Sequence, residues 1–294
     1  MSNDYDYAME RRLRELNPEL HNRFTESVFG LQHILSNYLL IFPTFTDHTE
    51  LHSLNVIDFC NRIIGSQLET LNADEIYSLL MGCYFHDTGM GIKEKDYEEF
   101  AKQIDFGDYF ETHERDCIPD IIRDFHNEFS GLFIKKYSDL FDIPSEEHLN
   151  AIIQISRGHR KTDLTDEKEY PIALPVESGN TICFPYLSGL IRLADEIDVA
   201  AGRNLSFLYD SDTLTNEKDI IEFGKHEAIT DVFVHKDRFV LAVDTKDEFV
   251  FNNIKKMAGK MQKTLDECRF AVNERTPHKL TQEFIEIKRK KESK

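Results

Sequence analysis

The sequence is poor in positive charge. It has 35 Lys and Arg residues against 54 Asp and Glu residues in a chain of 294, which gives a net charge of −19. A protein of this charge repels polyanions at long range, so binding to long nucleic acid or to an anionic membrane surface is disfavoured. The sequence also contains no stretch of about 18 uncharged apolar residues, which excludes an obvious membrane-spanning helix.

Several other features are absent. The five cysteines are odd in number and form no CxxC pair, a pattern typical of reduced core thiols rather than of a disulfide framework. The first 20 residues contain neither an apolar segment nor a small-residue cleavage site, which predicts a cytoplasmic protein. A GxxxxGK phosphate loop, a complete HExxH helix and a GxSxG elbow are all missing, which argues against the enzyme classes that use them.

Apolar residues make up 40% of the chain, enough for a packed core in one large domain or in one domain with an appendage. Their helical spacing predicts helices over residues 7–42, 47–64, 111–142, 146–158 and 186–202. The most apolar stretch, IYSLLMGCYF, predicts a helix buried on every side that ends at His86-Asp87. Residues 161–183 have no clear period and three Pro or Gly residues, which predicts an irregular insertion of the kind that often forms a lid.

The pattern changes in the last third of the chain. The runs ITDVFV and RFVLAVD, joined by His235-Lys236-Asp237, predict a β-hairpin. A long amphipathic helix over about residues 249–273 and a last strand at FIEIK follow. The predicted fold class is therefore mainly α, with a helical domain over residues 1–205 and a small α+β extension over residues 206–294.

Several polar residues lie within apolar, core-facing patterns on different predicted helices. Burying an imidazole or a carboxylate is costly unless it finds a hydrogen-bond partner or a metal. Helical bundles build metal sites from donors on separate helices, and a mixed His and carboxylate set suits a first-row or hard divalent cation. Satisfied core hydrogen bonds are the alternative reading of the same residues, which are His52, His86, Asp87, His126, His159 and Asp195.

The order of these residues resembles the HD-domain phosphohydrolase superfamily over about residues 47–200. The resemblance rests on HSLNV at His52, on His86-Asp87 and on LADEID around Asp195. It implies a helical bundle in which His52, His86, Asp87 and Asp195 hold a divalent metal. It also implies that His126 and His159 either complete a second metal site, bridged by Asp87, or contact the substrate phosphate. The run FPTFTDHTELHSLNV is also similar to HD modules that precede Hsp90-type ATPase regions in bacterial conflict proteins.

The resemblance implies a metal-dependent phosphohydrolase that acts on a nucleotide or another small phosphate ester or anhydride. The expected cofactor is one or two ions of Mn, Fe, Ni, Co, Zn or Mg, which would lower the pKa of bound water from 15.7 toward about 7. Asp87 and His126 are the candidate catalytic residues, and Arg157, Arg160 and Lys161 are the candidate phosphate-binding residues around His159. The alternative for these three cations is a solvated helix end whose charge complements the helix dipole.

Two other functions are compatible with the same residues. One is a phosphodiesterase or nuclease of the same superfamily, and the other is a regulatory HD module that binds nucleotide or metal without turnover and controls an associated effector. Besides the small phosphorylated substrate, the expected partner is a second copy of the chain or such an effector, with no membrane contact.

Overall fold

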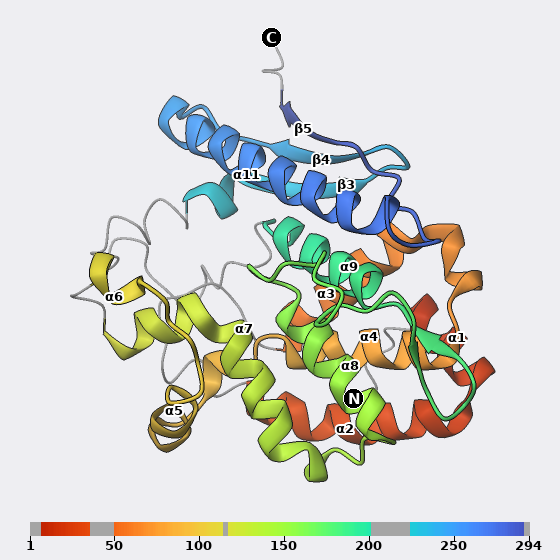
Figure 1. The fold of residues 1–294 in the computed structure, drawn as a ribbon. Helices are drawn as coiled ribbons and strands as arrows, with labels where there is room; N and C mark the ends of the chain where they lie inside the picture. The colour runs from red at the N-terminus through yellow and green to blue at the C-terminus, as the bar shows by residue number, and fades with distance from the viewer. Residues whose placement is uncertain (1–6, 36–49, 114–116, 201–223, 291–294) are drawn as a thin grey trace.

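The computed structural model describes residues 7–35, 50–113, 117–200 and 224–290. Figure 1 shows a helical bundle with a small sheet and one long helix on top of it. The predicted class, mainly α with a small α+β extension, is confirmed. The bundle helices are α1 (Ala8–Leu16), α2 (Pro18–Leu35), α3 (Glu50–Ile64), α4 (Ala73–Phe85), α5 (Glu94–Phe100), α6 (Tyr109–Thr112), α7 (Ile118–Tyr137), α8 (Glu146–Arg157) and α9 (Phe184–Ile197). Short 3-10 turns follow α3, α4 and α7 at η2 (Gly65–Thr70), η3 (Thr88–Gly91) and η4 (Ser138–Leu140).

The extension contains β3 (Ile229–Val234), β4 (Arg238–Val243), α11 (Glu248–Asn273) and β5 (Phe284–Arg289), with strand order β3-β4-β5. The predicted hairpin pairs β3 with β4 antiparallel, while β5 pairs with β4 in parallel after the crossover through α11. Helix α11 packs closely on α9, since a Cβ added at Gly189 would lie 3.2 Å from Cγ2 of Val272. The predicted division near residue 205 lies outside the described residues and stays a prediction.

Local sequence signals explain most helix ends. Asn17 and Pro18 break the predicted helix over residues 7–42 into α1 and α2, because the Asn17 side chain accepts from the backbone N–H of Glu19 and Leu20 and proline is favoured in a first turn. Helix α3 ends as predicted at Gly65, whose φ of +54° suits glycine. The residues predicted as helix at 36–42 and 47–49 lie outside the described part of the chain.

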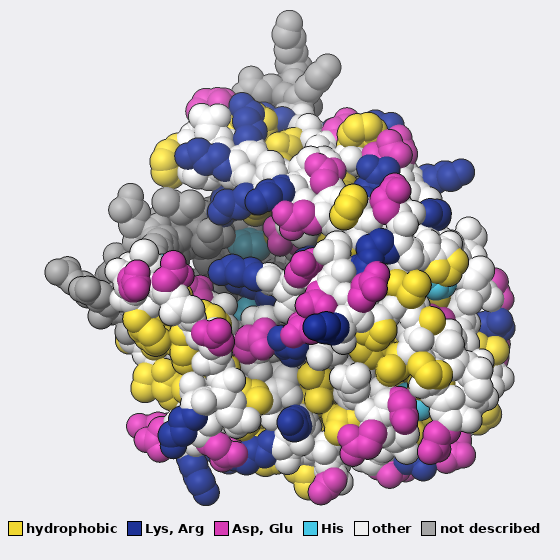
Figure 2. All heavy atoms as spheres, in the orientation of Figure 1, with side chains coloured by type: hydrophobic (Ala, Val, Ile, Leu, Met, Phe, Trp, Pro, Cys, Tyr) yellow, Lys and Arg dark blue, Asp and Glu magenta, His cyan; other side chains and the backbone are white. Residues whose placement is uncertain are grey.

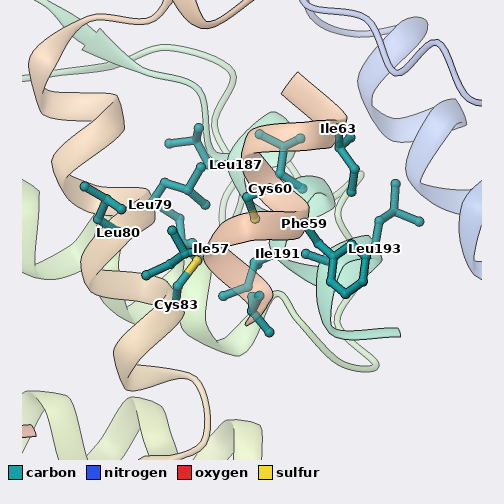
Figure 3. Packing of buried hydrophobic residues seen from close by; sticks show 14 of the residues in the cluster. Ile57, Phe59, Cys60, Ile63, Leu79, Leu80, Cys83, Leu187, Ile191 and Leu193 are labelled. Carbon is teal, nitrogen blue, oxygen red and sulfur yellow. The ribbon is translucent and has the colours of Figure 1, made fainter. Parts of the chain in front are cut away.

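Helix α4 is the central helix of the bundle. Asn72 and Glu75 form a capping box at its start, and every residue from Ala73 to Phe85 is buried. Figure 3 shows Cys83 of α4 next to Ile57 of α3, with Leu187 and Ile191 of α9 in the same cluster of buried residues. The prediction of a helix buried on every side is therefore confirmed, and it places His86 and Asp87 in the interior.

The structure corrects three details. The helix predicted over residues 111–142 is shorter, since α7 runs from Ile118 to Tyr137 and is kinked at Phe125 (φ −118°, ψ 16°). The insertion over residues 161–183 is mostly irregular but includes the short antiparallel pair β1 (Leu174–Pro175) and β2 (Thr181–Ile182). The cysteines are free, but Cys117 is exposed at the start of α7 and is not a core thiol. Within the described ranges, no helix has the length and apolar character needed to cross a bilayer.

A polar network around the buried carboxylate of Asp74 ties this insertion to the bundle. Asp74, in the first turn of α4, accepts hydrogen bonds from Nε2 of His148 at 2.9 Å, from Oγ of Ser178 at 2.8 Å and from Nδ2 of Asn180 at 2.7 Å. Burial alone would raise the pKa of Asp74, but these three donors lower it to about 2. The carboxylate therefore holds the tip of the insertion against α4 and α8.

Replacing Asp74 with alanine is expected to lower the free energy of unfolding at pH 7 by about 1–3 kcal/mol, because the buried His148 loses its acceptor and the insertion loses two further hydrogen bonds. A folded-state pKa below the unfolded value of about 3.9 gives stability that is present above pH 4 and is lost as the pH falls toward 2. The difference between wild type and Asp74→Ala should therefore shrink over that range. Urea denaturation at several pH values measures it, with the exposed Asp139→Ala as the control. Equal stability of wild type and Asp74→Ala at pH 7 would contradict the assignment.

Candidate metal centre

Five elements of the bundle bring polar side chains to one point. His52 lies on α3, His86 and Asp87 follow α4, His126 follows the kink of α7, His159 follows α8 and Asp195 lies on α9. The four histidines and Asp87 are each at most 4% exposed, and the Asp195 side chain is 16% exposed. The structure thus brings together all six residues predicted as metal ligands.

Two groups of three ligand atoms form around Asp87. One group contains His52, His86 and Asp87, the other contains Asp87, His126 and His159, and within each group the ligand atoms lie within 4.8 Å of one another. Oδ2 of Asp87 is 3.4 Å from Nε2 of His52 and 3.3 Å from Nε2 of His86. Its other oxygen, Oδ1, is 3.4 Å from Nε2 of His126 and 3.9 Å from Nε2 of His159. Each carboxylate oxygen thus faces one pair of histidines, which is the arrangement of a bridging ligand.

The hydrogen-bond partner of Nδ1 in each imidazole determines whether Nε2 carries a proton or a lone pair. Nδ1 of His86, His126 and His159 contacts the backbone carbonyl oxygen three residues earlier, and Nδ1 of His52 lies 2.7 Å from Oδ2 of Asp198. These oxygens only accept hydrogen bonds, so each Nδ1 carries the proton. In a neutral imidazole, Nε2 then presents a lone pair. All four lone pairs point into the cluster.

This arrangement fits a bound cation better than a hydrogen-bonded core. Nε2 of His52 is 3.1 Å from Nε2 of His86, and Nε2 of His126 is 2.8 Å from Nε2 of His159. Two lone pairs this close repel each other unless a cation lies between them. The mixed imidazole and carboxylate set suits a first-row divalent metal, so these buried His and Asp groups can hold one.

Burial keeps His159 in the protonation state that metal binding requires. Burial, reinforced by His126 and His86, lowers the pKa of His159 well below its usual value and keeps that imidazole neutral. A neutral imidazole is the form that binds metals.

A comparison with protein families agrees with this geometry. The family model named HD-CE matches residues 42–269. The chain belongs to the HD-CE family. The HD-CE match extends beyond α9 and covers most of α11, so it includes parts of both predicted domains. No curated protein and no solved structure is significantly similar to this chain.

Further residues of the HD-CE domain, to which the sequence assigned no role, support the candidate ligands. Asp198 contacts Nδ1 of His52 and also accepts from Nδ2 of Asn55 at 3.4 Å. Ser130 donates from Oγ to the carbonyl of His86 at 2.6 Å and accepts from the backbone N–H of Gly89 at 2.8 Å. Outer partners of this kind orient metal-binding imidazoles. The sequence indicates these two supporting residues only weakly, because Asp198 is three residues after Asp195 and Ser130 is four residues after His126.

Arg192 fixes the loop that carries His159. Its guanidinium is buried on α9 and donates from Nε to the carbonyl of Gly158 at 2.7 Å. It also donates to the carbonyl and the hydroxyl of Thr162 at 2.8 and 2.9 Å. The two anchored residues bracket His159, so Arg192 sets the path of the chain between them. An arginine in an apolar helix pattern gave no sequence signal for this role.

The three candidate phosphate-binding cations have different surroundings. Arg157 is bound by both carboxylate oxygens of Glu128, at 2.9 and 3.1 Å, and by Oε1 of Gln154 at 2.7 Å. Its charge is therefore largely compensated by Glu128. Arg160 is half-buried and Lys161 is exposed. Figure 2 shows histidine side chains at the bottom of a hollow beneath the α+β extension, with Lys and Arg side chains next to this hollow.

Proposed function

We propose that this HD-CE domain is a metal-dependent phosphohydrolase that cleaves a nucleotide or another small phosphate ester or anhydride. The observation that carries the proposal is the pair of histidine groups that share Asp87, because each oxygen of one carboxylate faces two imidazole lone pairs. A divalent cation bound there would act as a Lewis acid on a phosphoryl oxygen and would lower the pKa of a bound water. This is the chemistry that hydrolysis of a phosphate group needs.

The residues of the chain have separate roles in this proposal. His52, His86 and Asp195 hold one side of the centre, His126 and His159 hold the other, and Asp87 links the two. Hydrolysis forms a bond from water oxygen to phosphorus and breaks the bond from phosphorus to the leaving oxygen, which takes up a proton. Negative charge on the phosphoryl oxygens needs nearby cations.

Arg160 and Lys161 are the cations proposed to bind that charge, because they directly follow His159 and are not tied to Glu128 as Arg157 is. We assign Arg157 a structural role instead, in which it joins the end of α8 to α7. The charge of −19 favours a small substrate over a long polyanion.

Turnover of purified substrates tests the proposal. The full chain, stripped with EDTA and reloaded with Mn²⁺, is expected to hydrolyse at least one member of a panel of nucleotides, p-nitrophenyl phosphate and bis-p-nitrophenyl phosphate, and to lose that activity without metal. Arg160→Ala should raise KM for the substrate, whereas Lys168→Ala, which removes an exposed cation of the insertion, should not. Cleavage of the diester alone would indicate a phosphodiesterase. Binding without turnover of any compound would contradict the enzyme and favour a regulatory module.

A further inference from the structure

A cavity of about 370 Å³ is lined by residues that neighbour the candidate ligands His126 and His159 in the chain. Four of its lining residues, 124, 125, 127 and 128, are within two positions of His126, and Arg157 and Lys161 are each two positions from His159. Gln103, Ile104 and Asp105 of the loop between α5 and α6, together with Tyr109 at the start of α6, form the other wall. Its volume falls within the range of small-molecule sites, about 300–1,000 Å³.

The charges in this cavity do not suit a phosphate group. Three carboxylates, from Asp105, Asp124 and Glu128, outnumber the two cations, Arg157 and Lys161. Arg157 is moreover held by Glu128 through two contacts. Because an anion would meet a net negative lining, the cavity fits an uncharged group that offers hydrogen-bond donors.

The walls of the cavity are suited to a flat ring. Tyr109 and Phe125 pack edge to face with ring centroids 5.0 Å apart, and the hydroxyl of Tyr109 donates to Oδ2 of Asp124 at 3.1 Å. These contacts hold both rings in place without a ligand. Tyr109 also stacks on His113, with ring centroids 4.3 Å apart. Aromatic and apolar walls with a few placed polar groups are typical of small-molecule sites.

We propose that this cavity binds the base of a nucleotide whose base carries an amino group, while its phosphate lies at the metal centre. The inference rests on the proposed function. The carboxylate of Asp105 and the amide of Gln103 supply acceptors for the amino group, as carboxylates and amides do for cytosine and adenine elsewhere. Lys161 belongs both to this cavity and to the loop after His159, so it lies between the base and the phosphate.

Calorimetric titration of the Mn²⁺-loaded full chain with AMP, GMP, CMP, UMP and inorganic phosphate tests the proposal. At least one of the three amino-bearing nucleotides should bind about tenfold or more tightly than UMP and than inorganic phosphate, because only those bases donate an amino hydrogen bond to the acceptors of Gln103 and Asp105. Equal affinity for all five compounds, or no binding of any of them, would overturn it.

Two matched pairs of variants locate the binding. Gln103→Ala and Asp105→Asn should each weaken that nucleotide severalfold and leave inorganic phosphate unchanged. The controls are Lys102→Ala and Asp108→Asn, which are exposed neighbours that do not line the cavity and should bind as wild type does. Wild-type affinity in both cavity variants would overturn the proposal. Hydrolysis of p-nitrophenyl phosphate, measured separately, reports on the proposed function, so the two can fail independently.

Discussion

Replacing Asp87 with alanine is expected to empty both sides of the metal centre at once. Asp87 is the one residue shared by the two ligand groups among the described residues, and each of its oxygens lies 3.3 to 3.9 Å from the Nε2 atoms of two histidines. Loss of an outer partner of a metal ligand already weakens metal binding by about 10–100-fold. Removing a shared ligand should therefore weaken it by more than about 100-fold.

Elemental analysis of protein purified without chelators measures this effect. Wild type is expected to contain two equivalents of a divalent metal and Asp87→Ala close to none. Asp58→Ala, which removes a carboxylate elsewhere on α3, controls for the change in net charge and should keep both ions.

Single histidine variants distinguish two ions from one. His52→Ala and His126→Ala each remove a ligand from one group only, so each is expected to retain about one equivalent. Retention of the full wild-type metal content in Asp87→Ala would contradict the bridging role. A wild type with one ion that survives His126→Ala would instead assign His126 and His159 to substrate contact.

The sequence predicted the helices that position the site better than it predicted the residues that hold the site's loops and ligands in place. Helix α4 was predictable because an apolar run with a capping residue leaves few alternatives, and its end placed His86 and Asp87 in the core. The candidate ligands were predictable because each interrupts an apolar pattern at a cost that only a partner can offset. Their convergence came from the resemblance to HD domains, since periodicity alone does not say which faces meet.

The remaining features depend on contacts between distant segments. The kink at Phe125 has no proline or glycine to mark it, and Arg192 is a single cation whose acceptors, Gly158 and Thr162, lie 34 and 30 residues away. The pairing of Arg157 with Glu128 also spans 29 residues. The basic residues around His159 therefore predicted three phosphate-binding cations, whereas we propose only Arg160 and Lys161 for that role because Arg157 is paired with Glu128.

Replacing Gly89 with alanine is expected to disrupt the centre without touching a ligand. Gly89 lies in η3, where a Cβ would lie 2.2 Å from the carbonyl oxygen of His126, 2.7 Å from the backbone nitrogen of Ser130 and 2.9 Å from Cβ of Phe129. Two of these three atoms belong to the backbone of α7, which cannot rotate away as the end of a flexible side chain can. The turn after Asp87 must then move away from α7, and this separates Asp87 from His126 and also breaks the hydrogen bond from Gly89 to Ser130.

The expected cost is about 3 kcal/mol of unfolding free energy, at the upper end for overpacking in a core, together with loss of metal. The matched control is Gly259→Ala on α11, where an added Cβ meets no atom within 4 Å and alanine favours the helix by up to about 1 kcal/mol. Thermal unfolding and metal content, measured for Gly89→Ala and Gly259→Ala, test both expectations.

Because the strain acts on one side of Asp87, any folded Gly89→Ala protein should lose the ion held by His126 and His159 before the one held by His52 and His86. Wild-type stability with both ions retained would show that η3 and α7 can separate without cost, and the close packing of the turn would then not be what holds the two sides together.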